Sequence, residues 1–225
     1  MRNAYFITGT DTSVGKTLVS CALLHAFAAR GKSVIGMKPV AAGCAPTPQG
    51  LVCEDVADLM AASTVPAPRE LVNPYAFQPP LAPHIAAAQA GVIIELEPLL
   101  AACGALQALA EVVIVEGVGG WRVPLNPRED SADLARRLGL PVILVVGMRL
   151  GCLSHALLTA QAIEASGLKL AGWVANRIDP LMAAFDDNLR ALQTRLAAPL
   201  LGVVPYASEP NAALAAEYLH LEKLT

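Results

Sequence analysis

The stretch that decides the fold of this chain is Gly9-Thr10-Asp11-Thr12-Ser13-Val14-Gly15-Lys16-Thr17. It follows an apolar run at 4–8 and opens an apolar stretch at 16–30 that Gly31 closes, so it predicts a strand, a glycine-rich loop and a helix in succession. Consecutive backbone N–H groups, a lysine and a hydroxyl at the start of a helix are the groups that hold nucleotide phosphates and magnesium. The sequence therefore predicts a P-loop.

The match to the common P-loop motif is imperfect at one position. Gly9 lies one residue earlier than the leading glycine of the common form, so this loop is one residue longer. The alternative is an ordinary glycine turn followed by an amphipathic helix, with Lys16 in solvent. Because the strand, the loop and the helix occur in the order that the motif requires, we favour phosphate binding.

Five further apolar runs predict the other strands of a sheet. They are uninterrupted rather than alternating, which is typical of parallel strands that are buried on both faces. Helical stretches such as 16–30 and 155–165 separate the runs and supply the crossovers of a parallel sheet. The expected fold class is α/β, with a P-loop NTPase-like, doubly wound, mainly parallel sheet flanked by helices. The five runs lie at 33–37, 112–115, 142–146, 170–175 and 200–204.

Length and composition favour one domain. The chain has 225 residues, of which 55% are hydrophobic and 16% charged, so it can bury one large core. No repeat, low-complexity tract or linker divides it, and we expect a single domain over residues 1–225. The segment 41–83 is irregular and richer in proline. We expect an excursion there, with a short helix near 54–62, that could shape a substrate pocket.

Charge, hydropathy and cysteine usage exclude several classes of protein. Sixteen basic and nineteen acidic residues give a formal net charge of −3 without a basic cluster, so no nucleic-acid partner is expected. No apolar run is long enough to span a membrane, and the N-terminus enters a strand without the zones of a signal peptide, which favours a cytoplasmic location. The five cysteines are scattered and lack metal-ligand spacing, which predicts reduced thiols, mostly in the core. They are Cys21, Cys44, Cys53, Cys103 and Cys152.

A P-loop needs an acidic side chain from another strand end to hold magnesium. Glu116 directly follows the apolar run 112–115 and is the first candidate, because a charge at that place is better explained by a cation than by an exposed turn. From the residues alone, Asp55 is a weaker candidate. Asp11, Glu54, Asp55 and Asp58 can each be a solvated surface charge, and periodicity does not choose among them.

Lys38 ends the second predicted strand, in the segment Lys38-Pro39-Val40. A lysine at a strand end is usually a solvated boundary residue. We expect this strand to lie next to the first one, which would bring its carboxyl end to the phosphates. A second ammonium there, beside Lys16, would stabilise the charge on a transferring phosphoryl group.

Together these residues resemble one family, the ATP-dependent dethiobiotin synthetases. The likeness runs along almost the whole chain, and the combination of the long P-loop with the Lys38 and Glu116 segments distinguishes this family from generic nucleotide switches. The matching segments are Gly9-Thr10-Asp11-Thr12 through Gly15-Lys16-Thr17, Lys38-Pro39-Val40, Asn73-Pro74-Tyr75, Pro83-His84, Val115-Glu116-Gly117, Gly119-Gly120-Trp121, Leu150-Gly151-Cys152 and Gly172-Trp173-Val174-Ala175-Asn176.

The resemblance implies an ATP- and magnesium-dependent ligase of biotin synthesis. Such an enzyme closes the ureido ring of dethiobiotin from 7,8-diaminopelargonate and carbon dioxide, through a carbamate and a carbamic-phosphoric anhydride, and releases ADP and phosphate. It is implied to be a homodimer with active sites at the interface. The reaction needs no protein nucleophile, so His84 and the cysteines are left with structural roles.

The resemblance also implies roles for individual residues. Lys16 and Lys38 would stabilise charge on the reacting groups, and Thr17, Asp55 and Glu116 would hold magnesium. Asn176 would contact adenine, although from the residues alone it is better explained as a strand-end residue that satisfies a turn. The implied ATP-binding set is Ser13, Val14, Gly15, Lys16, Thr17, Leu18, Asp55, Glu116, Gly117, Val118, Gly119, Asn176, Arg177, Pro205, Tyr206 and Ala207. The implied substrate set is Thr12, Lys38, Ala42 and, across the dimer interface, Leu150, Gly151 and Cys152.

Several positions depart from the family pattern. Ser13 stands where many members carry glutamate, and Ala42 stands where a serine that contacts the substrate is common. Leu81-Ala82 replaces small hydroxyl residues, and Ser154 replaces an asparagine. Because the loss of one hydroxyl contact costs about 1 kcal/mol, we expect these changes to affect substrate affinity and to leave the phosphate chemistry intact.

Three other functions are weighed against this one. A P-loop switch or partition-type ATPase would bind a macromolecular partner, but its loop usually begins with lysine-glycine-glycine, where this chain has Thr8-Gly9-Thr10. A ligase or amidotransferase acting on a larger acid would need a further domain to supply ammonia. A nucleotide-binding module without catalysis leaves Lys38 and Glu116 unexplained.

Overall fold

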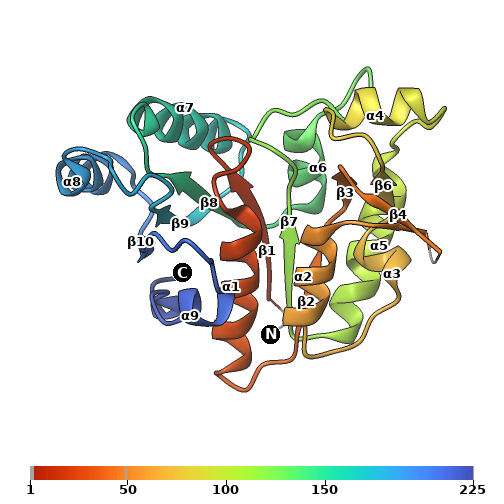
Figure 1. The fold of residues 1–225 in the computed structure, drawn as a ribbon, viewed down its shortest axis with the longest axis horizontal. Coiled ribbons are helices and arrows are strands. Elements are labelled where there is room, and N and C mark those ends of the chain that lie inside the picture. The colour runs from red at the N-terminus through yellow and green to blue at the C-terminus, as the bar shows by residue number, and fades with distance from the viewer. Residues whose placement is uncertain (1–2, 49, 225) are drawn as a thin grey trace.

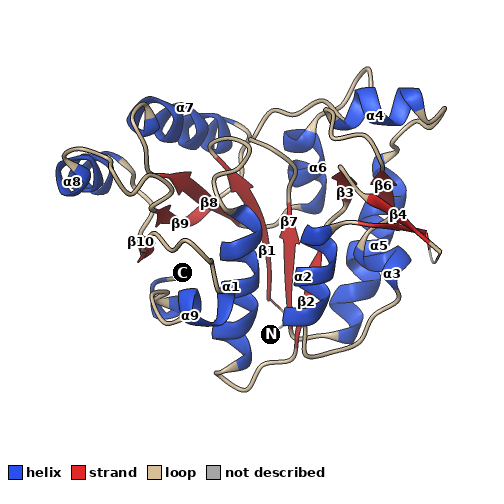
Figure 2. Ribbon diagram, viewed as in Figure 1, coloured by secondary structure: helices blue, strands red, loops and turns tan. Residues whose placement is uncertain are grey.

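The centre of the fold is a six-stranded sheet in which all neighbouring strands run parallel (Figures 1 and 2). The computed structural model describes residues 3–48 and 50–224; residues 1–2, 49 and 225 of the expected 1–225 domain lie outside this description. The strand order is β10-β9-β8-β1-β7-β2. Each strand coincides with a predicted apolar run to within two residues at either end. The strands are β1 (Asn3–Gly9), β2 (Val34–Met37), β7 (Val112–Glu116), β8 (Val142–Gly147), β9 (Leu170–Asn176) and β10 (Leu200–Val204).

Helices cover both faces of this sheet, as the uninterrupted apolar strands require. Alternate residues of a strand enter two separate cores: Phe6 packs with one cluster of buried residues and Ile7 with the other. The first core also takes residues from α5 (Leu96–Leu109), α6 (Ser131–Leu138), α7 (Cys152–Ala165) and α8 (Phe185–Arg195). The second is covered by α1 (Lys16–Ala28), α9 (Ala212–Ala216) and part of α2 (Glu54–Ala62). The predicted α/β class is confirmed.

The order of the strands corrects one expectation. The second strand, β2, does not lie beside β1; β7 is inserted between them and pairs with both. The crossover through α1 therefore skips one position in the sheet, and the later strand β7 fills it. All five residues of β7 are buried, as expected for a strand inside a parallel sheet that helices cover on both faces. Glu116, at its end, thus lies between the ends of β1 and β2.

The expected excursion carries more regular structure than the sequence indicates. Its predicted helix is α2, and α3 (Arg69–Val72) and α4 (Pro83–Gln89) follow. Two pairs of short strands were not predicted, because three residues are too few to show a period. These pairs are β3 (Val40–Ala42) with β6 (Tyr75–Phe77), which run parallel, and β4 (Ala45–Thr47) with β5 (Gly50–Val52), which run antiparallel.

The prediction that all cysteines are reduced thiols is wrong for one pair. Cys44 and Cys53 form a disulfide with their Cα atoms 4.3 Å apart. They flank the β4–β5 hairpin, whose pairing of Ala45 with Val52 brings the two chain ends together. Their separation of nine residues carries no signal unless the hairpin is known. The other three cysteines are buried free thiols, as predicted, and burial raises the pKa of Cys21 to about 12 and of Cys103 to about 11.

The C-terminal segment closes over the edge strand β10. The backbone N–H of His220 donates to the carbonyl oxygen of Leu201 at 2.7 Å, and Gly202 forms an isolated bridge with Leu219. The preceding helix α9 packs against α1 (Figure 1). This segment ends in a 3-10 turn at Leu221–Lys223. Within the described part of the chain, no helix combines the length and apolarity needed to cross a bilayer.

Candidate functional site

The predicted phosphate loop joins β1 to α1 at the carboxyl edge of the sheet. Ser13 and Gly15 both have left-handed backbones, with φ of 59° and 84°, and such turns direct successive N–H groups into one concavity. Helix α1 begins without a side-chain cap and without an acidic residue in its first turn, so its free N–H groups remain available to an anion. Lys16 crosses the loop and donates from Nζ to the carbonyl oxygen of Asp11 at 3.0 Å.

Asn176, at the end of β9, supports this loop from behind. Its Nδ2 donates to the carbonyl oxygen of Val14 at 2.9 Å, and it is buried. A Cβ atom at Gly15 would lie 2.1 Å from the same Nδ2, so only glycine fits there. Asn176 thus holds the loop directly, which is more than the strand-end role that its sequence alone suggests.

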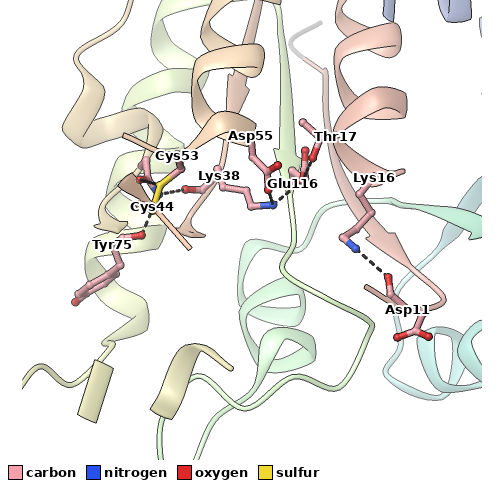
Figure 3. Close-up of polar contacts among 10 residues, drawn as sticks. Asp11, Lys16, Thr17, Lys38, Cys44, Cys53, Asp55, Tyr75 and Glu116 are labelled. Atoms are coloured by element: carbon pink, nitrogen blue, oxygen red, sulfur yellow. Dashed lines mark hydrogen bonds and ion pairs between the residues drawn. A yellow bond between two sulfur atoms is a disulfide. The ribbon is translucent and has the colours of Figure 1, made fainter. Parts of the chain in front are cut away.

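Four polar residues, from α1, α2, the end of β7 and the position after β2, meet beside the loop, and we call them the Lys38 cluster: Thr17, Lys38, Asp55 and Glu116 (Figure 3). Lys38 is only 4% exposed, and its Nζ donates to Asp55 Oδ2 at 2.7 Å and to Glu116 Oε1 at 2.6 Å. The hydroxyl of Thr17 donates to the same Glu116 oxygen at 2.9 Å. The structure therefore brings the three proposed magnesium residues together with Lys38, one of the two proposed catalytic lysines.

The pKa values of these groups follow from burial and mutual charge. Burial lowers the pKa of Lys38, but Glu116 and Asp55 outweigh it and raise that pKa above its ordinary value. Burial raises the pKa of Asp55, but Lys38 outweighs it and holds the carboxyl below its usual range. Burial, helped by the positive charge of Lys38, lowers the pKa of Lys16 to about 8. Bound phosphates would reverse that effect, since they favour the charged lysine.

The cluster fits a magnesium ion. Glu116 is fully buried, and its Oε2 has no hydrogen-bond partner among the described residues. Hydroxyl and carboxylate oxygens are the ligands that Mg²⁺ prefers, and it is usually bound by one or two carboxylates together with phosphates. Accordingly, residues 3–48 and 50–224 contain no group of three or more histidines, cysteines, aspartates or glutamates that could hold a metal by itself. Nucleotide phosphates would have to complete the site.

Of the four acidic residues that the sequence could not rank, Asp55 is the one that enters the cluster. Asp11 instead pairs with Arg149, whose Nη2 lies 2.6 Å from Asp11 Oδ2. The partner of Asp11 was not predicted, because nothing in the local sequence relates two loops so far apart. This ion pair joins the phosphate loop to the segment that precedes α7.

A cavity of about 410 Å³ opens on the other side of the loop. Its volume and its mixture of apolar and amide groups suit a nucleoside. Eight residues of the implied ATP-binding set line it: Ser13, Gly15, Leu18, Asn176, Arg177, Pro205, Tyr206 and Ala207. The sequence did not single out the rest of the wall, because it comes from an irregular turn and from a face of α9 with no motif. The additional lining residues are Ile178, Val204, Glu209, Pro210, Asn211, Leu214, Ala215 and Tyr218.

The segment after β7 lies against the phosphate loop and does not line this cavity. The N–H of Gly117 donates to the carbonyl oxygen of Ile7 at 2.9 Å, and a Cβ on Gly119 would lie 3.5 Å from Thr12 Oγ1. Gly117 and Val118 line a small separate pocket with Glu116. The predicted nucleotide residues Glu116, Gly117, Val118 and Gly119 are thus grouped on the side of the loop that faces the Lys38 cluster.

The implied substrate residues are dispersed in the single chain. Lys38 lies in the cluster, Thr12 is exposed on the phosphate loop, and Ala42 is half-buried at the end of β3. Leu150 is 96% exposed, and Cys152 is buried at the start of α7. Leu150 therefore has almost no contacts within its own chain.

The sequence of this chain is similar to one family model and to enzymes from other organisms. A family model described as an AAA domain matches residues 3–213. The ATP-dependent dethiobiotin synthetase of Nitrosospira multiformis is 58% identical over 94% of this chain and 92% of that protein. The enzyme of the same name from Aromatoleum aromaticum is also 58% identical, over 97% of each chain.

A solved structure with a similar fold is the septum site-determining protein MinD of Pyrococcus horikoshii, complexed with Mg-ADP. It superposes with a TM-score of 0.54 at 16% identity, covering 99% of this chain and 89% of that one, and it supports the fold alone. The identity of more than half of the residues to the two synthetases extends over nearly the full length of this chain. The chain therefore belongs to the ATP-dependent dethiobiotin synthetase family and is an ATP-dependent ligase.

Proposed function

We propose that this protein closes the ureido ring of dethiobiotin, using 7,8-diaminopelargonate, carbon dioxide and ATP. The observation that carries this proposal is the Lys38 cluster beside the phosphate loop. A nucleotide switch hydrolyses ATP with its phosphate loop and one acidic residue. That reaction does not require a second, buried lysine between two carboxylates, such as Lys38. A reaction that transfers a phosphoryl group to an anionic acceptor does need that second positive charge.

The proposed reaction has three steps. One amine of the substrate adds to carbon dioxide and loses a proton, which gives a carbamate. A carbamate oxygen then attacks the γ-phosphorus of ATP, ADP leaves, and a carbamic-phosphoric anhydride forms. The neighbouring amine attacks the carbonyl carbon of that anhydride, phosphate leaves with the bonding electron pair, and loss of a proton from the attacking nitrogen completes the ring.

The residues of this chain act on the charge that these steps create. Lys16 would contact the terminal phosphates from the loop, and Lys38 would stabilise charge on the carbamate and the transferring phosphoryl group. Thr17, Asp55 and Glu116 would hold magnesium, which when bound neutralises charge on the phosphates. The base and ribose of ATP would occupy the 410 Å³ cavity, beside Asn176. Because the reaction consumes ATP, a cytoplasmic location is part of the proposal.

The proposal is tested by measuring ADP and phosphate release from purified protein. We expect release to require magnesium, bicarbonate and 7,8-diaminopelargonate together, and mass spectrometry to detect dethiobiotin as the product. Omission of the diamine is the decisive control, since a switch or partition-type ATPase hydrolyses ATP without it. Equal hydrolysis with and without the diamine would refute the proposed function and favour that alternative.

A homodimer is the second part of the proposal. Leu150, which precedes α7, and Leu158, on α7, are 96% and 62% exposed, and we propose that the second protomer covers them. We expect light scattering coupled to size exclusion to give twice the mass of the 23.4 kDa chain. Leu158→Lys should shift the protein towards the monomer. Leu109→Lys is the matched control, because Leu109 is 48% exposed on α5, a different helix. A monomeric wild-type protein with full activity would rule out a shared active site.

A further inference from the structure

The residues proposed to hold magnesium are already engaged with each other and with a lysine. Lys38 Nζ lies 2.7 Å from Asp55 Oδ2 and 2.6 Å from Glu116 Oε1, and the Thr17 hydroxyl donates to that same Glu116 oxygen at 2.9 Å. All three proposed ligands therefore bind one another or the ammonium (Figure 3). The second oxygen of the buried Glu116 carboxylate, Oε2, has no hydrogen-bond partner among the described residues.

Burial makes this ammonium necessary for the free protein. The side chain of Glu116 is completely buried and that of Lys38 is 5% exposed. A buried carboxylate without a counter-ion is strongly destabilising, so a positive charge must be present in the cluster whether or not a metal is bound. Lys38, paired with Asp55 and Glu116, supplies that charge.

Because of these contacts, Lys38 and a divalent cation would compete for the same oxygens of Asp55 and Glu116. Two cations in contact with one oxygen repel each other, and the repulsion is weakly screened in a buried site. Negative phosphate oxygens remove this conflict, because they can pair with both cations. Metal binding should therefore be weak in the free protein and strong together with the nucleotide.

Hydrogen bonds hold the backbone of Lys38 in place, so only its side chain is free to move away from the carboxylates. The N–H of Lys38 donates to the carbonyl oxygen of Val72 at 2.8 Å, and its own carbonyl oxygen accepts from Asn73 Nδ2 at 2.7 Å. The peptide is thus fixed on both sides at the end of β2. The flexible four-carbon stem can move the ammonium while the strand stays in place.

We propose that Lys38 is a resident counter-ion that occupies the place of magnesium between Asp55 and Glu116 until the metal enters with the nucleotide phosphates and releases the ammonium towards the reacting groups. The inference rests on the proposed function, which supplies the metal and the phosphates. It adds a sequence of events to that function: the metal and the nucleotide bind first, and only then is Lys38 available for the reaction.

The test measures Mn²⁺ binding to nucleotide-free protein, with the free ion followed by electron paramagnetic resonance. Lys38→Met removes the competing charge, and we expect it to bind Mn²⁺ about tenfold more tightly than the wild type, or better. Lys32→Met is the matched control, because Lys32 forms an exposed ion pair with Glu111 at 2.9 Å away from the cluster. We expect the control to keep the affinity of the wild type. The thermal midpoint of Lys38→Met should also rise more with Mn²⁺ than that of the wild type.

Two further variants keep the test decisive. If Lys38→Met fails to fold, Lys38→Gln replaces it, since glutamine is neutral but still donates hydrogen bonds to a carboxylate. Adding Asp55→Asn to the neutral variant should abolish the gain in affinity, which locates the ion at the cluster. Unchanged Mn²⁺ affinity in a folded neutral variant, or a gain that survives Asp55→Asn, would overturn the inference.

These measurements contain no diamine, so they separate the inference from the proposed function. If Lys38→Met binds Mn²⁺ tightly but the wild type makes no dethiobiotin, the counter-ion role stands and the proposed reaction fails. If the wild type makes dethiobiotin but the neutral variants bind Mn²⁺ no better than it does, the reaction stands and the counter-ion role fails.

Discussion

Replacing Lys16 with alanine is expected to lower turnover by a factor of about 100 or more. Lys16 lies buried across the phosphate loop, with its ammonium 3.0 Å from the carbonyl oxygen of Asp11. No other lysine projects from the start of α1, so the variant loses the charge that would contact the terminal phosphates during transfer. The measurement is the initial rate of ADP release with saturating bicarbonate and diamine, together with the affinity for ATP by calorimetry.

Two comparisons make the result specific. Lys38→Ala should lose activity to a similar extent, because the proposed transition state needs both ammonium groups. Lys32→Ala should retain wild-type activity, since Lys32 is half-exposed and pairs with Glu111, which lies outside the Lys38 cluster. Near-normal turnover in Lys16→Ala, with unchanged thermal stability, would show that the loop does not bind phosphates in the proposed way.

Replacing Gly202 with alanine is expected to destabilise the fold by about 1–3 kcal/mol, as extra atoms in a packed interior do. A Cβ at Gly202 would lie 2.1 Å from the carbonyl oxygen of Tyr218, a backbone atom that cannot move by itself. The C-terminal segment would have to separate from β10. Because Tyr218 and Leu214 also line the 410 Å³ cavity that we propose for the base and ribose of ATP, we expect weaker ATP binding as well. Urea denaturation gives the first effect and calorimetry the second.

Gly104→Ala provides the matched control. Gly104 lies inside α5, where an added Cβ has no neighbour within 4 Å, so alanine there should stabilise the helix by about 0.5–1 kcal/mol. Opposite signs for the two glycines would attribute the loss in Gly202→Ala to the close contact with Tyr218. Equal stability of Gly202→Ala and the wild type would mean that the C-terminal segment is not held against β10 in solution.

The strands of the central sheet could be predicted because burial on both faces leaves its mark in consecutive apolar residues. The position of each strand in the sheet leaves no such mark. For this reason β2 was expected beside β1, whereas the inserted β7 places Glu116 between their ends. Lys38 still reaches the phosphate side, but through a contact with the end of β7 and not through pairing with β1.

Sequence motifs identified the phosphate loop and most of the Lys38 cluster, but they did not predict contacts between segments that are far apart in the sequence. Asp55 could not be distinguished from Asp58 by periodicity, because both lie on the same helix and only the position of Lys38 decides between them. The pair of Asp11 with Arg149 and the cavity wall from Glu209 to Tyr218 depend on how distant loops meet. Sequence-local patterns contain no information about such meetings.

The disulfide between Cys44 and Cys53 also bears on the entropy of the unfolded chain. It closes a loop of about ten residues. In the chain-entropy model, the lower entropy of the unfolded chain raises the free energy of unfolding by roughly 2.7 kcal/mol. The hairpin that it encloses has strands of three residues and little core of its own. Cys53 directly precedes α2 and lies two residues before Asp55. The covalent link therefore preorganises the start of that helix, so that Asp55 loses little freedom when it takes up a cation.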